Sequence, residues 1–195
     1  MRGPIRLKNL RLRFLPYYVV GAVVILLVRP TPSGYVGGAA IVVLGAALRS
    51  WGAGHLVKND ALTITGPYAH LRHPLYLGTL LVGQGFALIV GGWLALAILA
   101  LLLPWFFLLY FPRKERIESA RLERRYAASY ALYRAQVPAL VPMARGWRPL
   151  QATPAFGDVD ARWSGERYRE NNELGALLAV TSGLVLLALR MSFVS

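Results

Sequence analysis

The chain is organised around the stretch Gly66-Pro67-Tyr68-Ala69-His70-Leu71-Arg72-His73-Pro74-Leu75-Tyr76-Leu77-Gly78. This stretch combines two histidines, an arginine, two prolines and two tyrosines, and an apolar run begins at Leu77. Pro74 suits the first turn of a helix, where its missing N–H costs no hydrogen bond. The sequence therefore predicts a cluster of polar side chains directly beside the start of a membrane helix.

The composition is typical of an integral membrane protein. Hydrophobic residues make up 56% of the 195 residues and charged residues only 16%, whereas a soluble domain has about 25% charged residues. We expect an all-α, polytopic helical bundle that forms a single membrane-embedded domain over residues 1–195. The absence of cysteine excludes disulfides, thiolate nucleophiles and cysteine-ligated metals.

The apolar runs predict five membrane spans, because a span needs about 20 predominantly apolar residues. Gly91-Gly92 leaves room only for a tight hairpin between two of them, and small residues in the second predict close helix packing. A hydrophilic helix and loop segment, residues 112–173, precedes the last span. The expected spans are residues 14–28, 35–53, 77–90, 93–111 and 174–193.

The net charge of +13 is explained by the membrane rather than by nucleic acid. Positive residues flank the apolar runs, where anionic headgroups and topology account for them, so no nucleic-acid partner is expected. Five basic residues and no acid precede the first apolar run. By the positive-inside rule the N-terminus is cytoplasmic, and we expect the protein in the inner (plasma) membrane of a bacterium or archaeon.

The residues of the opening stretch allow two interpretations. Imidazoles, phenols and the free N–H groups of a helix start can bind a polar ligand at the membrane surface. Tyrosine and arginine can equally serve as interfacial anchors. A metal site at His70 and His73 is not expected, because Pro74 opposes a helix through both and no acidic partners complete a ligand set.

A second region, residues 116–138, predicts a helix with one aromatic face. Leu122, Tyr126, Tyr130 and Tyr133 follow each other at intervals of four, four and three residues. Val137-Pro138 ends this helix. Considered alone, the pattern also fits a surface amphipathic helix.

Together the two regions resemble the membrane methyltransferases related to isoprenylcysteine carboxyl methyltransferase and phospholipid methyltransferases. The elements are Gly-Pro-Tyr with Arg-His-Pro-x-Tyr-x-Gly, followed after a helical hairpin by Glu-x-x-x-Leu, Tyr-x-x-Tyr-x-x-x-Val-Pro and a further proline. The resemblance covers residues 47–142. The matching residues are Gly66-Pro67-Tyr68, Arg72 to Gly78, Glu118, Leu122, Tyr130, Tyr133, Val137, Pro138 and Pro142.

The resemblance implies that S-adenosylmethionine binds at the cytoplasmic face and that a lipophilic acceptor, a carboxylate, amine or thiol, approaches from the bilayer. The family commonly has two adjacent acids where this chain has Glu118 and Ser119. The implied catalytic residues are Glu118, Tyr130 and Arg134. The implied cofactor-binding residues are Tyr68, His73, Pro74, Tyr76, Leu77, Glu118 and Tyr133.

Two other functions are compatible with parts of the sequence. Sterol-type reductases, which use NADPH, resemble this family in its C-terminal half, although the short chain leaves few residues for a second nucleotide half. A non-catalytic scaffold or lipid-binding protein would need only the interfacial arginine, tyrosine and tryptophan residues. The scaffold predicts no polar, aromatic-lined pocket beside Tyr76.

Overall fold

The computed structural model describes residues 28–57, 61–150, 154–156 and 162–194, and its regular elements in these ranges are all helical. The predicted all-α class is confirmed. The first predicted span, 14–28, lies outside the described residues except for Val28. The elements are α2 (Pro32–His55), η3 (Gly66–Ala69), α3 (Pro74–Val90), α4 (Gly92–Pro104), η4 (Trp105–Tyr110), α5 (Phe111–Gln136), η5 (Pro154–Phe156), α6 (Gly165–Glu170) and α7 (Glu173–Val194).

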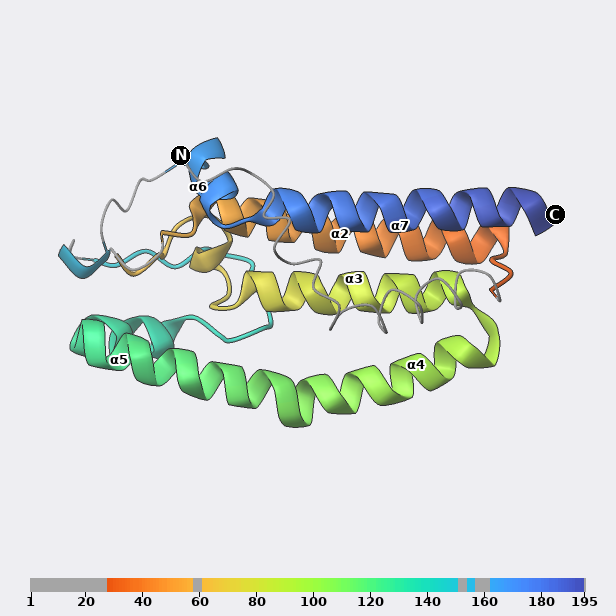
Figure 1. The fold of residues 1–195 in the computed structure, drawn as a ribbon. Coiled ribbons are helices and arrows are strands. Elements are labelled where there is room, and N and C mark those ends of the chain that lie inside the picture. The colour runs from red at the N-terminus through yellow and green to blue at the C-terminus, as the bar shows by residue number, and fades with distance from the viewer. Residues whose placement is uncertain (1–27, 58–60, 151–153, 157–161, 195) are drawn as a thin grey trace, which may run out of the picture.

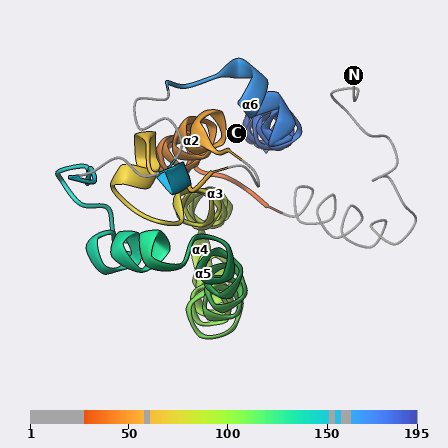
Figure 2. The ribbon, with the colours of Figure 1, turned by 90° about the vertical axis from the view of Figure 1, so that its left-hand side faces the viewer.

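The long helices lie side by side along one axis (Figure 1). Viewed along this axis, α3 lies between α2 and the α4–α5 helix, and α7 packs on the other side of α2 (Figure 2). The polar elements η3 and α6 and the end of α5 gather at one end of the bundle, opposite the hairpin that joins α3 to α4. The residues predicted for the site are therefore concentrated at one end.

Glycines allow α2 and α3 to pack backbone against backbone. A Cβ on Gly38 would lie 2.5 Å from the carbonyl oxygen of Gly85, and one on Gly45 would lie 2.7 Å from that of Gly78. Close approach at small residues is the usual basis of helix packing in lipid. The predicted role of the small residues in the second span is confirmed.

The predicted tight hairpin at Gly91-Gly92 is also confirmed. Helix α3 ends at Val90 and α4 begins at Gly92. Gly91 has φ of 70° and Gly92 has φ of 57°, a region that glycine enters without the steric penalty of a Cβ. The chain thereby reverses direction within two residues.

The helix that begins at Gly92 continues through residue 111 as far as Ala127, whereas the sequence predicted a span ending at residue 111 and a separate helix after it. Pro104 is followed by the π-helical segment η4, and the Phe111 N–H donates to the carbonyl of Phe106, five residues back. A π-helical segment changes the hydrogen-bond register without ending the helix. The apolar and the charged parts are therefore continuous.

A sharp turn at Ala127 redirects the last part of α5. Ala127 has φ of 38° and ψ of −114°, outside the helical region, and residues 128–136 turn away from the preceding helix (Figure 1). Helix α5 then ends at Gln136, because Val137 is extended and Pro138 follows. This end matches the prediction, but the turn at Ala127 was not predicted.

Three described helices are long and apolar enough to cross a membrane: Pro32–His55, Gly92–Gln136 and Glu173–Phe193. They support an integral membrane protein. The predicted third span forms Pro74–Val90, which is apolar but has only 17 residues. The structure thus supports three of the five predicted spans.

A partly buried ion pair connects α7 to α2. The Nε and Nη2 atoms of Arg49 in α2 donate to the two carboxylate oxygens of Glu173, at 2.6 and 2.9 Å. Arg49 Nη1 also donates to the Leu75 carbonyl, at 3.2 Å, and to the Thr79 hydroxyl in α3. One guanidinium thus links α2, the first turns of α3 and the start of α7.

Candidate active site

The candidate site lies where the chain enters α3. His73 is the N-cap, and its backbone angles (φ −126°, ψ 60°) lie outside the helical region, which the residue before a proline avoids. The N–H groups of Arg72 and His73 donate to the carbonyls of Pro138 and Ala139, at 2.9 and 3.0 Å. The segment after α5 therefore holds the start of α3 in place.

Three predicted residues meet at this helix start. The Tyr76 hydroxyl donates to Oε1 of Glu118, and Oε2 of Glu118 lies 3.6 Å from Nδ1 of His73. The His73 ring contacts Tyr76 and Phe111, with centroid distances of 5.5 and 5.3 Å. A carboxylate beside aromatic rings is suited to a cationic group.

His73 is buried and incompletely bonded. Its side chain is 7% exposed, and Nε2 has no hydrogen-bond partner. Burial and, to a smaller extent, the nearby Arg72 charge lower the pKa of His73 to about 4, and Glu115 partly opposes this shift. The imidazole is therefore neutral at pH 7. Buried polar atoms normally have a hydrogen-bond partner, so the unpartnered Nε2 atom is exceptional.

Arg72 connects the elements around this site. Its Nε donates to the Val137 carbonyl at 3.0 Å, Nη1 to the Tyr130 hydroxyl at 3.3 Å and Nη2 to Glu115 at 2.7 Å. The guanidinium thus joins the segment before α3 to both halves of α5. Arg72 is part of the predicted motif, whereas no role was predicted for Glu115.

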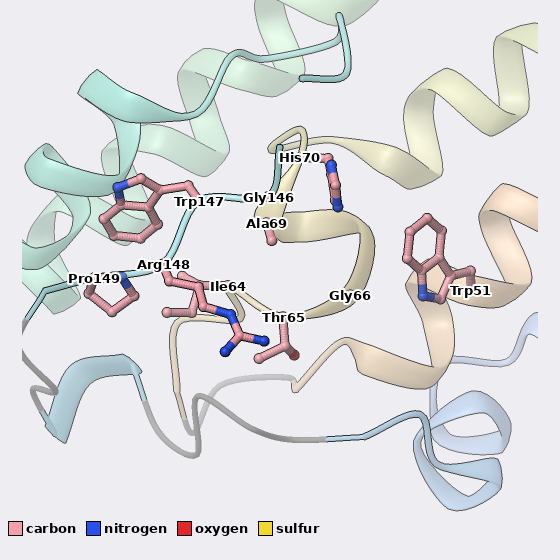
Figure 3. Close-up of a pocket in the computed structure, with 10 residues that line it drawn as sticks. All are labelled: Trp51, Ile64, Thr65, Gly66, Ala69, His70, Gly146, Trp147, Arg148 and Pro149. Atoms are coloured by element: carbon pink, nitrogen blue, oxygen red, sulfur yellow. The ribbon is translucent and has the colours of Figure 1, made fainter. Parts of the chain in front are cut away.

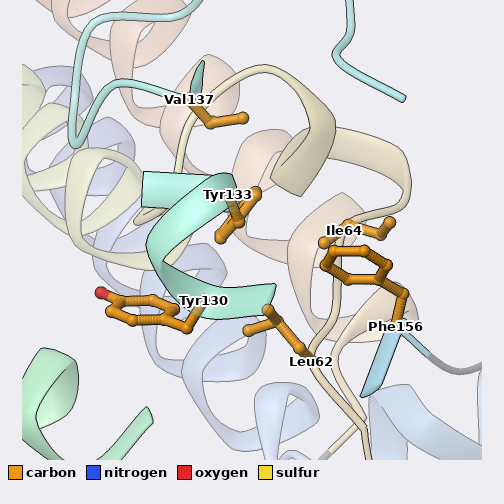
Figure 4. Packing of buried hydrophobic residues seen from close by; sticks show 6 residues of the cluster. All are labelled: Leu62, Ile64, Tyr130, Tyr133, Val137 and Phe156. Carbon is orange, nitrogen blue, oxygen red and sulfur yellow. The ribbon is translucent and has the colours of Figure 1, made fainter. Parts of the chain in front are cut away.

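The predicted tyrosines of α5 are parts of the protein core. The Tyr133 hydroxyl donates to the Tyr68 carbonyl at 2.7 Å, and the Tyr130 hydroxyl shares a 2.7 Å hydrogen bond with Ser119. Both rings pack in a cluster whose other buried members come from three further segments (Figure 4). Those members are Leu62, Ile64, Val137 and Phe156.

The remaining predicted residues differ in their surroundings. Tyr68 and Pro74 are buried, and Leu77 is half-buried one turn after His73. Arg134 is half-exposed and forms a 2.6 Å ion pair with Glu123. The structure therefore brings His73, Tyr76 and Glu118 together but pairs Arg134 elsewhere.

A separate cavity of about 580 Å³ lies beside the same stretch (Figure 3). Trp51 and His70 lie on one side of it and Trp147 on the other. His70 Nδ1 donates to the Met143 carbonyl at 2.8 Å. None of the predicted site residues lines this cavity. Its lining residues are Trp51, Ile64, Thr65, Gly66, Ala69, His70, Gly146, Trp147, Arg148 and Pro149.

Sequence reasoning assigned no function to residues 146–149, because they match no motif. The pair Trp147-Arg148 in a segment rich in Gly and Pro was the available signal. Within the described ranges, no group of three or more His, Cys, Asp or Glu residues could hold a metal ion.

Comparison with known proteins finds similarity to membrane methyltransferases. The family model for phospholipid methyltransferases matches residues 34–129, from α2 to just beyond the turn at Ala127. Over 109 residues the chain is 29% identical to the protein-S-isoprenylcysteine O-methyltransferase of Schizosaccharomyces pombe. The aligned part covers 56% of this chain and 44% of that relative, so the chain spans less than half of the relative's length. No solved structure matches.

These two matches support the family that the motifs predicted. Residues 34–129 are similar to phospholipid methyltransferases, and together the matches point to a membrane methyltransferase.

Proposed function

We propose that this protein transfers a methyl group from S-adenosylmethionine to a lipophilic acceptor, and that the cofactor binds beside His73, Tyr76 and Glu118. The observation that carries this proposal is the unpartnered, buried Nε2 of His73. It lies in a cluster that also holds two aromatic rings and a carboxylate. A bound ligand would satisfy this nitrogen.

The chemistry of these residues fits the cofactor. Its sulfonium and amino groups are positively charged, and the faces of Tyr76 and Phe111 and the Glu118 carboxylate attract positive charge. Because the His73 imidazole is neutral at pH 7, it adds no repulsion. The Tyr76 hydroxyl bonded to Glu118 fixes the direction of the carboxylate.

The reaction asks little more of the protein than positioning. S-adenosylmethionine supplies a methyl group that is already activated. The role of the chain is then to align the acceptor with that methyl group and to exclude water. Buried Phe111 and the neighbouring rings of Tyr76 and Phe106 form an apolar surface that excludes water. Because the cofactor is already activated, the site needs no catalytic nucleophile with a neighbouring general base.

The position of the cluster favours an acceptor that partitions into the membrane. The site lies at the start of α3, and both α3 and α4 are apolar along their length. A carboxylate, an amine or a thiol can act as the accepting group. A prenylated cysteine, which the name of the relative specifies, is one candidate. We further propose that residues 1–195 act as one domain with the N-terminus in the cytoplasm.

The proposal is tested by titrating the detergent-purified protein with S-adenosylhomocysteine, the stable product, in a calorimeter. We expect His73→Ala to weaken binding about tenfold or more, because a buried polar partner is lost. His70→Ala is the matched control, since His70 lies in the same stretch but faces the separate cavity. Equal affinity of wild type and His73→Ala, or a larger loss in His70→Ala, would contradict this placement.

A further inference from the structure

Arg72 is a buried cation that needs a compensating carboxylate. Its side chain is 9% exposed. Among the described residues, Glu115 supplies the carboxylate within ion-pair distance, at 2.7 Å. A buried charge without its partner is strongly destabilising, whereas a neutral acceptor compensates only part of it. The Tyr130 hydroxyl and the Val137 carbonyl are such neutral acceptors.

Ser119, one helical turn after Glu115, is connected to the same guanidinium through the Tyr130 hydroxyl. Residues 115 and 119 are four apart in α5 and therefore share a face of the helix. The buried Ser119 hydroxyl lies 2.7 Å from the Tyr130 hydroxyl, which accepts from Arg72 Nη1 at 3.3 Å. Glu115 therefore contacts Arg72 directly and carries a charge, whereas the uncharged Ser119 is connected to Arg72 through Tyr130.

Glu118 does not form an ion pair with Arg72. Its carboxylate is turned toward Tyr76 and His73. The two acids therefore have separate tasks: Glu118 belongs to the proposed ligand cluster, and Glu115 holds the arginine that precedes His73. Ser119 stands at the position where the family that this chain resembles commonly has a second acid.

We propose that Glu115 is a positioning residue of the site, which acts through Arg72, and that a carboxylate at position 119 can take over its role. This inference rests on the proposed function for its effect on cofactor binding. Arg72 also bonds to Pro138 and Val137, and His73 bonds to Ala139. The Glu115–Arg72 pair therefore sets the distance between α5, the segment after it and the start of α3.

The test compares four proteins: wild type, Glu115→Gln, and the double variants Glu115→Gln with Ser119→Asp and Glu115→Gln with Ser119→Asn. Aspartate and asparagine have nearly the same shape, so the double variants differ only in charge. We expect Glu115→Gln to weaken S-adenosylhomocysteine binding about tenfold. Ser119→Asp should restore most of this loss, and Ser119→Asn should not.

A second measurement is independent of the cofactor. The ring signal of His73 in a carbon–proton NMR spectrum reports its place against Tyr76 and Phe111, and His73→Gln identifies it among the three histidines. We expect this signal to move in Glu115→Gln and to return with Ser119→Asp only. A wild type that binds no S-adenosylhomocysteine would overturn the proposed function, while the NMR signal would still decide the positioning role.

Two results would overturn the inference itself. One is a Glu115→Gln protein whose His73 signal stays at the wild-type position. The other is equal restoration by Ser119→Asn and Ser119→Asp, because packing rather than charge would then explain the effect.

Discussion

His73 is buried, neutral at pH 7 and left with an unpartnered ring nitrogen, and these properties make it the centre of the candidate site. The motifs predicted that His73, Tyr76 and Glu118 act together, and the structure places them side by side. The same reasoning placed Arg134 with them, although it pairs with Glu123. Arg134 lies in the part of α5 that follows the turn at Ala127, and no sequence signal marks this turn.

The pKa of His73 predicts a specific dependence of stability on pH. Its value falls from the usual 6.5 to about 4 in the folded protein. Between these values the unfolded chain binds more protons, so stability decreases as the pH falls through this window and levels off below about 4. The full effect is about 3 kcal/mol.

This dependence can be measured as the thermal unfolding midpoint in detergent at pH 7 and pH 5. His73→Gln is the reference, because glutamine does not titrate and the neighbouring Arg72, Glu115 and Glu118 are kept. The midpoint of the wild type should fall further than that of the variant. Equal decreases would show that His73 is not held neutral by its surroundings.

At the scale of elements, the helix ends that glycine and proline set were predictable. The continuation of the helix past residue 111 was not. Pro74, Gly91 and Val137-Pro138 mark ends in both sequence and structure. The change from an apolar to a hydrophilic sequence suggested that the span ends at residue 111, but the helix continues through this region. The π-helical segment η4 allows this by changing the hydrogen-bond register. No residue pattern in the sequence predicts this change.

Two adjacent glycines in α2 provide a test of the α2–α3 packing. A Cβ on Gly38 would lie 2.5 Å from the Gly85 carbonyl oxygen, whereas a Cβ on Gly37 would meet nothing within 4 Å. We expect Gly38→Ala to destabilise the protein by about 1–3 kcal/mol through overpacking. Gly37→Ala should leave stability unchanged or raise it slightly, because alanine favours a helix.

Thermal unfolding of the two variants in one detergent gives the comparison. A Gly38→Ala protein as stable as Gly37→Ala would contradict the close contact between α2 and α3.

At the scale of the whole molecule, the family match covers only part of the helical bundle. The match covers residues 34–129, and the motif resemblance covers 47–142. Helix α7 lies beyond both but is tied to α2 and to the start of α3 by the Arg49–Glu173 pair. Sequence reasoning recognised α7 as a span. The ion pair was not predictable, because its partners are far apart in the chain and match no motif.

The same scale explains how the site could be predicted in outline. The motifs lie at helix ends that the bundle gathers at one end, so their proximity follows from the alternation of spans and connections (Figure 1). The cavity beside Trp51 and Trp147 depends instead on an irregular segment. No periodicity or spacing in residues 146–149 signals where that segment folds.

The central claim is that this membrane protein uses S-adenosylmethionine, and one calorimetric comparison tests it most directly. The purified wild type is titrated with S-adenosylhomocysteine and, in parallel, with NADPH. Our account predicts saturable binding of S-adenosylhomocysteine and none of NADPH. Binding of NADPH alone would support a reductase instead, and binding of neither would contradict the proposed cofactor.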